Sequence, residues 1–304
     1  MIRLQRGPGI LSLAIPLLCA VASAESSSPA PHPSADAIMA RVARLQDQAQ
    51  AERARYVYVQ HATVSSRRGH TIHCQEITDT RIAPSVSGSH EQLLNLNGRV
   101  LIKGRYVDYH TLSADKGHPE DNDAVSIEIG DDDSDRDMVE NMRKNLLGTG
   151  SKDGINANLF PLTTKEQAGE EFLYVGRERL NGRDVDHVTF RPKDKSDFGW
   201  KGDAWTDTVT GEPVVIETAL SRRIPAAVRV LLGTNVPGLG FTVVYAPQPD
   251  GVWFPASFST EFQIHVLFFF RRTIIIDAQN RGFEKTYVSS RILGEATPEL
   301  PPNP

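Results

Sequence analysis

The run Phe254–Phe270 constrains the fold of this chain more than any other stretch. Alternate positions from Phe254 onward are mostly apolar, whereas the positions between them are polar as far as His265. A repeat of two residues is typical of a β-strand with one buried face, and it excludes a helix, whose repeat is 3.6 residues. The run is about three times the usual strand length of about 5–6 residues, which favours a strongly coiled antiparallel sheet or barrel. From Val266 to Phe270 both faces are apolar, so we expect this end to be covered on both sides.

The start of the chain has the pattern of an export signal. Met1–Ala24 contains two arginines, then the apolar stretch Ile10–Val21, then a small-x-small motif at its end. The apolar stretch is shorter than the ~20 residues that a membrane span needs, so the pattern predicts a signal peptide cleaved after Ala24. Leu17 and Leu18 precede Cys19, where a lipidation box requires a small residue directly before the cysteine. We therefore expect an exported, soluble periplasmic protein without a lipid anchor.

Cysteine content and charge narrow the possibilities for the mature chain. Cys74 is the only cysteine after the signal, so no intramolecular disulfide can form, and the fold must depend on its apolar core. Removing Arg3 and Arg6 leaves 31 basic and 38 acidic residues, a formal charge of −7. This balance argues against nucleic acid and against an anionic membrane surface as the main partner. We expect a monomer.

The first part of the mature chain is predicted to contain one helix and a hairpin. Residues 25–33 are a serine- and proline-rich leader, and residues 34–292 are predicted to form a single domain. Ser34 can cap an amphipathic helix whose apolar positions are Ile38, Val42, Leu45 and Ala49. Strands are predicted at Tyr56–Ser65 and Thr71–Ile82, a short helical segment at Glu91–Leu96, and one strand at Val100–Tyr109.

An acidic insertion is expected at about residues 113–151. Counting a calcium loop from Asp131 places Arg136 where glycine is needed and Met142 where glutamate is needed, so the calcium interpretation fails. The pattern favours a helix capped by Ser134 with an apolar stripe, which consists of Met138, Met142 and Leu146.

The remainder predicts sequential antiparallel strands, and the overall class is α+β. The Asn181-Gly182 pair is typical of a type I′ hairpin turn. The expected strands are Phe172–Leu180, Asp184–Arg191, Ala204–Asp207, Pro213–Leu220, Phe241–Tyr245, the long run, Arg272–Ile276 and Phe283–Ser290. Residues 293–304 form a proline-rich tail.

Several of these strands and turns carry a family resemblance. The motifs are Asn181-Gly182-Arg183 with Val188-Thr189-Phe190-Arg191-Pro192, then Ala204-Trp205-Thr206-Asp207 with Thr210-Gly211-Glu212-Pro213, and finally Asp250-Gly251-Val252-Trp253-Phe254-Pro255. In this order they resemble the LolA/LolB-like superfamily of outer-membrane lipoprotein-sorting proteins and related periplasmic proteins. The resemblance covers roughly Ser34–Tyr58 and Phe172–Ser290. It implies a curved, incomplete antiparallel barrel whose apolar concave face is covered by helices.

No catalytic or metal-binding constellation stands out in the sequence. His61, His70, His73 and Cys74 lie near one another, but adjacent strand residues face opposite ways, so His73 and Cys74 cannot share a site without a bulge. Motifs for serine nucleophiles, zinc proteases and phosphate loops are missing from the sequence. We therefore expect no enzyme activity and no cofactor.

The apolar strand face is the one candidate site. It is either an ordinary core or a cavity for lipid or the acyl chains of lipoproteins. Its proposed lining is Phe190, Ile216, Leu220, Phe241, Phe254, Phe258, Phe262, Ile264 and Phe268. The first hypothesis is a periplasmic carrier or chaperone with a transport role. The alternative is a sensing or interaction module in the envelope, which uses the Asp115–Asp137 acidic segment to bind a basic protein partner.

Overall fold

One curved antiparallel sheet dominates the part of the chain that can be described. The computed structural model describes residues 33–85, 88–112, 134–147, 160–194, 200–221, 234–235, 239–266 and 270–286. These all belong to one compact unit, Pro33–Pro304. The predicted signal peptide, nearly all of the predicted leader, most of the acidic insertion and the C-terminal tail lie outside the described residues.

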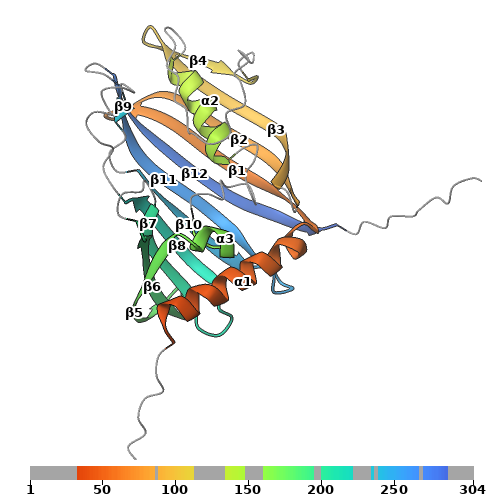
Figure 1. Cartoon of the computed structure of the whole chain (residues 1–304). Coiled ribbons are helices and arrows are strands. Elements are labelled where there is room, and N and C mark those ends of the chain that lie inside the picture. The colour runs from red at the N-terminus through yellow and green to blue at the C-terminus, as the bar shows by residue number, and fades with distance from the viewer. Residues whose placement is uncertain are drawn as a thin grey trace, which may run out of the picture. The chain divides into compact units, whose positions relative to one another are not determined.

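Twelve described strands form this sheet, and it stays open because its end strands do not pair with each other. The order is β4-β3-β2-β1-β12-β11-β10-β8-β7-β6-β5, with β9 paired to β11 (Figure 1). The bounds are β1 Tyr56–Arg68, β2 Thr71–Ser85, β3 Gly88–Ile102, β4 Arg105–Tyr109, β5 Glu170–Leu180, β6 Arg183–Pro192, β7 Trp200–Asp207, β8 Pro213–Leu220, β9 Thr234–Asn235, β10 Gly240–Pro247, β11 Trp253–Val266 and β12 Phe270–Lys285. The curved, incomplete barrel expected from the sequence is confirmed.

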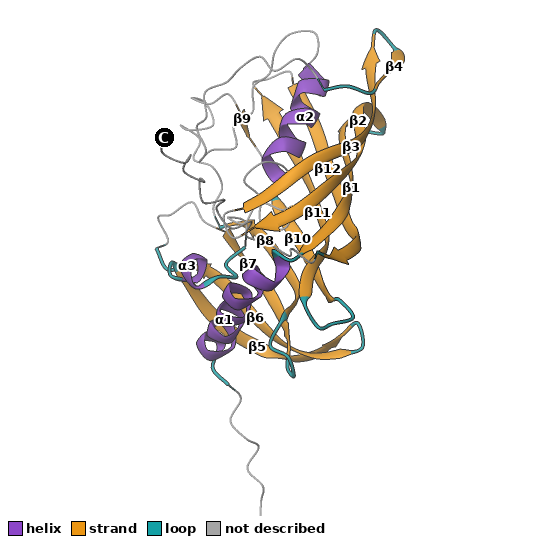
Figure 2. Cartoon of the chain, turned by 90° about the vertical axis from the view of Figure 1, so that its right-hand side faces the viewer, coloured by secondary structure: helices purple, strands orange, loops and turns teal. Residues whose placement is uncertain are grey.

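Three described helices lie on one side of this sheet, as the side view in Figure 2 shows. They are α1 (Ala35–Arg53), α2 (Ser134–Leu147) and α3 (Thr164–Gln167). Ser34 caps α1, since its hydroxyl accepts a hydrogen bond from the Ala37 amide at 3.2 Å. The helix predicted after Ser134 is also confirmed, with Met138, Met142 and Leu146 all buried. We call the side that carries the helices the inner face.

Two local predictions between β2 and β4 were wrong. Glu91–Leu96 is not helical but forms the middle of β3, because its backbone pairs with β2 from Ile82 to Thr78. Helix propensity is a weak preference that strand pairing overrides. Val100–Tyr109 is a hairpin rather than one strand, since Lys103 and Gly104 both adopt positive φ, at 50° and 78°. This is the geometry of a type I′ turn.

The long run was also predicted to extend too far. Strand β11 ends at Val266, which pairs with Phe270, the first residue of β12. The two predicted strands around Asn280 and Gly282 are instead one continuous strand, β12. Gly282 has a φ of 64°, next to a shift in the register between β1 and β12. Gly282 lies in a β-bulge at this point, so the strand bends there but does not end.

A second bulge changes which residues of β11 share a face. Tyr245 of β10 pairs with Pro255, but the preceding residue, Val244, pairs with Ser257. The extra residue breaks the repeat of two that the sequence shows from Phe254 onward. Phe254 therefore separates from the other phenylalanines of the run.

Gly202 of β7 gives a direct test of how tightly this sheet is coiled. A Cβ added there would lie 1.8 Å from the Glu217 carbonyl oxygen and 2.9 Å from Phe190 Cζ. We expect Gly202→Ala to lower the free energy of unfolding by about 1–3 kcal/mol, because backbone of β8 would have to shift. Gly176→Ala in β5 is the matched control, since a Cβ there meets nothing within 4 Å. Urea denaturation of both variants measures the difference, and equal stabilities would contradict the tight approach.

Candidate functional site

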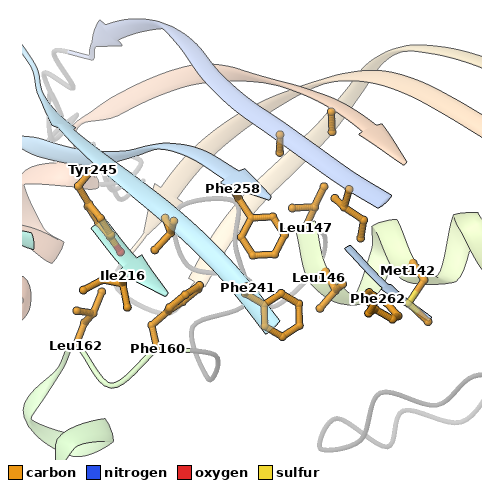
Figure 3. Close-up of a cluster of buried hydrophobic side chains, with 14 of the residues drawn as sticks. Met142, Leu146, Leu147, Phe160, Leu162, Ile216, Phe241, Tyr245, Phe258 and Phe262 are labelled. Carbon is orange, nitrogen blue, oxygen red and sulfur yellow. The ribbon is translucent and has the colours of Figure 1, made fainter. Parts of the chain in front are cut away.

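The inner face of the sheet carries one large apolar cluster that the helices cover. It includes residues of α1, α2, the segment before α3, and strands on both halves of the sheet. In Figure 3, Met142, Leu146 and Leu147 of α2 point toward Phe258 and Phe262 of β11 and Phe241 of β10. Phe160 and Leu162 lie with Ile216 and Tyr245 in the same cluster.

Six of the nine predicted lining residues come together in this cluster. They are Phe190, Ile216, Phe241, Phe258, Phe262 and Ile264, and each is at most 3% exposed. Phe241 and Phe258 stack with their ring centroids 5.7 Å apart. Contact between these residues and a ligand stays a prediction.

The other three predicted residues lie elsewhere. Phe254 belongs to a second cluster with Tyr56, Tyr58 and Ile82, since the bulge in β11 turns it away from Phe258. Leu220 is half-buried at the end of β8, where its amide donates to the Leu239 carbonyl at 3.1 Å. Phe268 lies outside the described residues.

Helix α2 is fastened to the sheet by a charged anchor at its first turn, which we call the Asp135 anchor. Arg272 of β12 donates two hydrogen bonds to the Asp135 carboxylate, both at 2.7 Å. The hydroxyl of Ser66 in β1 donates to the same carboxylate at 2.6 Å. His73 Nδ1 lies 3.4 Å from it, and burial together with Arg272 lowers the pKa of His73. Paired donors of this kind set the orientation of a helix as well as its position.

A second anchor lies near the other end of α2, and we call it the Glu76 anchor. Glu76 of β2 is fully buried, and Arg143 Nε donates to it at 3.0 Å. The hydroxyl of Tyr109 donates to the other carboxylate oxygen at 3.0 Å. Burial raises the pKa of Glu76, although Arg143 opposes this. The α2 helix is therefore held by two sets of charges and by an apolar stripe between them.

The cysteine beside this anchor is not a reactive thiol. Cys74 is buried, its sulfur lies 3.3 Å from the Tyr109 oxygen, and burial raises its pKa to about 12. A thiol with such a pKa stays protonated at neutral pH and is a poor nucleophile. His61 lies apart from Cys74, with its Nδ1 at 2.9 Å from Asp79. Within the described ranges, no group of three or more histidine, cysteine, aspartate or glutamate side chains could hold a metal ion.

The two anchors were missed by the sequence reasoning. The sequence predicted a helix after Ser134 but assigned no contact to Asp135, and it assigned no role to Glu76. The position of Glu76 could have indicated a buried charge, because Glu76 lies on the same face of β2 as Cys74 and Thr78, which are also buried. A charge at a buried strand position usually has a partner. That this partner would be Arg143, 67 residues away, could not be read from the pattern.

The acidic segment proposed for a protein partner is partly engaged within the chain. Asp135 is bound to Arg272 and Ser66, so it is not available to a basic partner in this conformation. Asp115–Asp133 lies outside the described residues. The interaction-module alternative thus stays a prediction.

No protein-family model and no curated protein sequence matches this chain. Solved structures similar to it include an outer membrane lipoprotein-sorting protein domain from Vibrio parahaemolyticus, at 12% identity and a TM-score of 0.36, covering 81% of this chain and 92% of that one. A LolA superfamily protein from Nitrosomonas europaea is 9% identical, with a TM-score of 0.32 and coverage of 85% and 96%. The Pseudomonas aeruginosa MucA/MucB complex is matched at 11% identity and a TM-score of 0.22, covering 81% and 99%.

These comparisons carry no conclusion about a ligand or partner of this chain. The open antiparallel sheet and its helix cover are established by this chain's own strand order and buried contacts. Among the described helices, none is long and apolar enough to cross a bilayer.

Proposed function

We propose that this protein is an exported periplasmic carrier that binds an acyl chain of a lipid or lipoprotein on the inner face of its sheet, without chemistry. The observation that supports this most is that amphipathic helices, rather than a second sheet, cover the apolar face. Helix α2 contacts this face through flexible side chains that include Met138 and Met142. Methionine adapts to irregular apolar surfaces, which suits a cover that can be exchanged.

The proposed binding position is the surface beneath α2. An acyl chain can replace the apolar stripe of the helix there, since each buried methylene group contributes about 0.8 kcal/mol. Helix α2 has 14 residues, and an isolated helix of about 12–15 residues is marginal in water. It therefore depends on the sheet for its stability, and its release is linked to exposure of Phe258 and Phe262.

The two anchors of α2 set the free energy that is needed to displace the helix from the sheet. In the closed state, the free energy of the ion pairs and the apolar contacts opposes ligand entry. The apparent affinity for an acyl chain is then reduced by the fraction of molecules in which the helix is displaced. Weakening an anchor should raise that fraction.

The test is an acyl-probe titration of the wild type and Asp135→Ala. We expect saturable binding by the wild type and tighter binding by the variant, by about fivefold or more, since a coupling of 1–3 kcal/mol corresponds to roughly 5–150-fold. Fluorescence of an environment-sensitive fatty acid measures both affinities. Asp36→Ala on α1 is the control, because Asp36 is exposed and lies in the first turn of the other long helix.

Two results would contradict the proposal. One is the absence of saturable binding in both proteins, together with no lipid in native mass spectra of protein purified from an envelope fraction. The other is equal affinity of the wild type and Asp135→Ala, which would place the probe away from α2.

A further inference from the structure

We infer that the opposite side of the sheet carries a second, separate binding site, which takes a zwitterionic group containing a phosphate and a primary ammonium. The site is a hollow of about 490 Å³ over four neighbouring strands, β5 to β8. A volume of this size lies within the usual range of small-molecule sites, about 300–1,000 Å³. It goes beyond the carrier function proposed above and does not depend on it.

The strand register shows toward which side the hollow opens. Its floor is the row Phe172, Phe190, Gly202 and Thr218, which are paired across the strands and are buried or half-buried. The residues on either side of this row along each strand also line the hollow, and six of these eight are exposed. Since strand side chains alternate between faces, these walls project to the side opposite the inner face.

The two walls carry opposite charges. One wall contains Arg191 and Lys201 with one acid, Glu171, and has a net positive charge; the other contains Asp203 and Glu217. The walls are two residues apart along each strand, about 6.6–6.8 Å at the usual rise. A ligand with an anionic and a cationic end, separated by a few bonds, matches this arrangement.

The acidic wall has an unbalanced charge that a ligand ammonium would neutralise. Asp203 and Glu217 are directly opposite each other on β7 and β8. Like charges in that position destabilise a strand pair. His187 Nε2 lies 2.7 Å from the Asp203 carboxylate. Among the residues that the structure describes, Glu217 has no ion-pair partner.

The basic wall provides the complementary half. Arg191 forms an ion pair with Glu171, with its Nε 2.9 Å from the carboxylate, whereas Lys201 has no ion-pair partner within the described ranges. Arginine and lysine are the usual ligands for phosphate oxygens. Leu173 and Ala219 add apolar surface to the walls, against which the carbon atoms between the two charges can pack. The chemistry shared by the fitting ligands is that of phosphoethanolamine, either in a lipid headgroup or as a free phosphodiester.

The experiment is isothermal titration of the full chain with sn-glycero-3-phosphoethanolamine. We expect saturable binding that weakens at least tenfold in Lys201→Gln and in Glu217→Gln. Lys165→Gln and Glu261→Gln are matched controls, because both residues are exposed and lie outside the hollow. sn-Glycero-3-phosphocholine should bind more weakly, since its quaternary ammonium cannot donate a hydrogen bond to Glu217.

A vesicle arm distinguishes the two sources of the ligand. Sedimentation with phosphatidylethanolamine vesicles, but not phosphatidylcholine vesicles, in a Lys201-dependent manner assigns the site to a lipid headgroup. Binding of the soluble compound alone assigns it to a free phosphodiester. Failure to bind either form overturns the inference, as does unchanged binding by both hollow variants or equally tight binding of inorganic phosphate. The acyl-probe result is independent of all these outcomes.

Discussion

Phe258→Ala and Phe262→Ala are each expected to lower the free energy of unfolding by about 3–5 kcal/mol. Both side chains are almost fully buried, at 1% and 3% exposure, and both belong to the cluster that α2 covers. Truncation removes burial and leaves a void that the coiled sheet cannot close. A loss of this size is a large part of a typical stability of about 5–15 kcal/mol.

Chemical denaturation measures both variants, with Val209→Ala as the control because that side chain is 82% exposed. The acyl-probe titration is run beside it. Large stability losses with an unaltered probe response would show that this face only holds the sheet to its helices, and the carrier proposal would lose its site. Small losses would show instead that the phenylalanines are not sealed by α2.

Arg143→Met is expected to lower the free energy of unfolding by about 3–5 kcal/mol, because it leaves Glu76 buried without its cation. Glu76 has no exposed side-chain surface, and Arg143 is 16% exposed. Lys144→Met is the matched control, being the next residue of the same helix with an exposed side chain. Equal losses in the two variants would contradict a specific role for the Glu76 anchor.

The pH dependence of stability supplies a second measurement of this anchor. Burial raises the pKa of Glu76 in the folded protein above its usual value. As the pH falls through that raised pKa, the folded state takes up a proton before the unfolded state does. The wild type should therefore gain stability relative to Glu76→Gln on acidification, and this gain should be complete once the pH is below the unfolded pKa. A constant difference between pH 7 and pH 4 would contradict the raised pKa.

Much of the local structure could be predicted from short patterns because its causes are local. Ser34 starts α1 through its own hydroxyl, and the Asn181-Gly182 pair adopts the positive φ values of a type I′ turn, at 51° and 79°. The same holds for the apolar stripe of α2. In each case, residues within a few positions of one another determine the outcome.

The errors arose where distant strands decide the conformation. Glu91–Leu96 pairs with β2, and Gly282 is absorbed in a bulge against β1. The break of the long run at Val266 likewise depends on a partner strand. Propensity and periodicity describe a single segment, so they do not contain the register that another segment imposes.

For the candidate sites, too, the sequence predicted the features of single segments, whereas the tertiary structure decided how those segments come together. The alternation of apolar and polar residues in Phe254–Phe270 by itself predicted that one strand face needs a cover, because this alternation is a property of the segment alone. The bulge that removes Phe254 from the other phenylalanines was decided by the pairing with β10. Only the tertiary structure decided that α2 provides this cover, since its two anchors join Asp135 to Arg272 and Arg143 to Glu76 across long stretches of chain. The hollow on the other side is also a tertiary feature, because its lining residues come from four strands that the sheet order brings together.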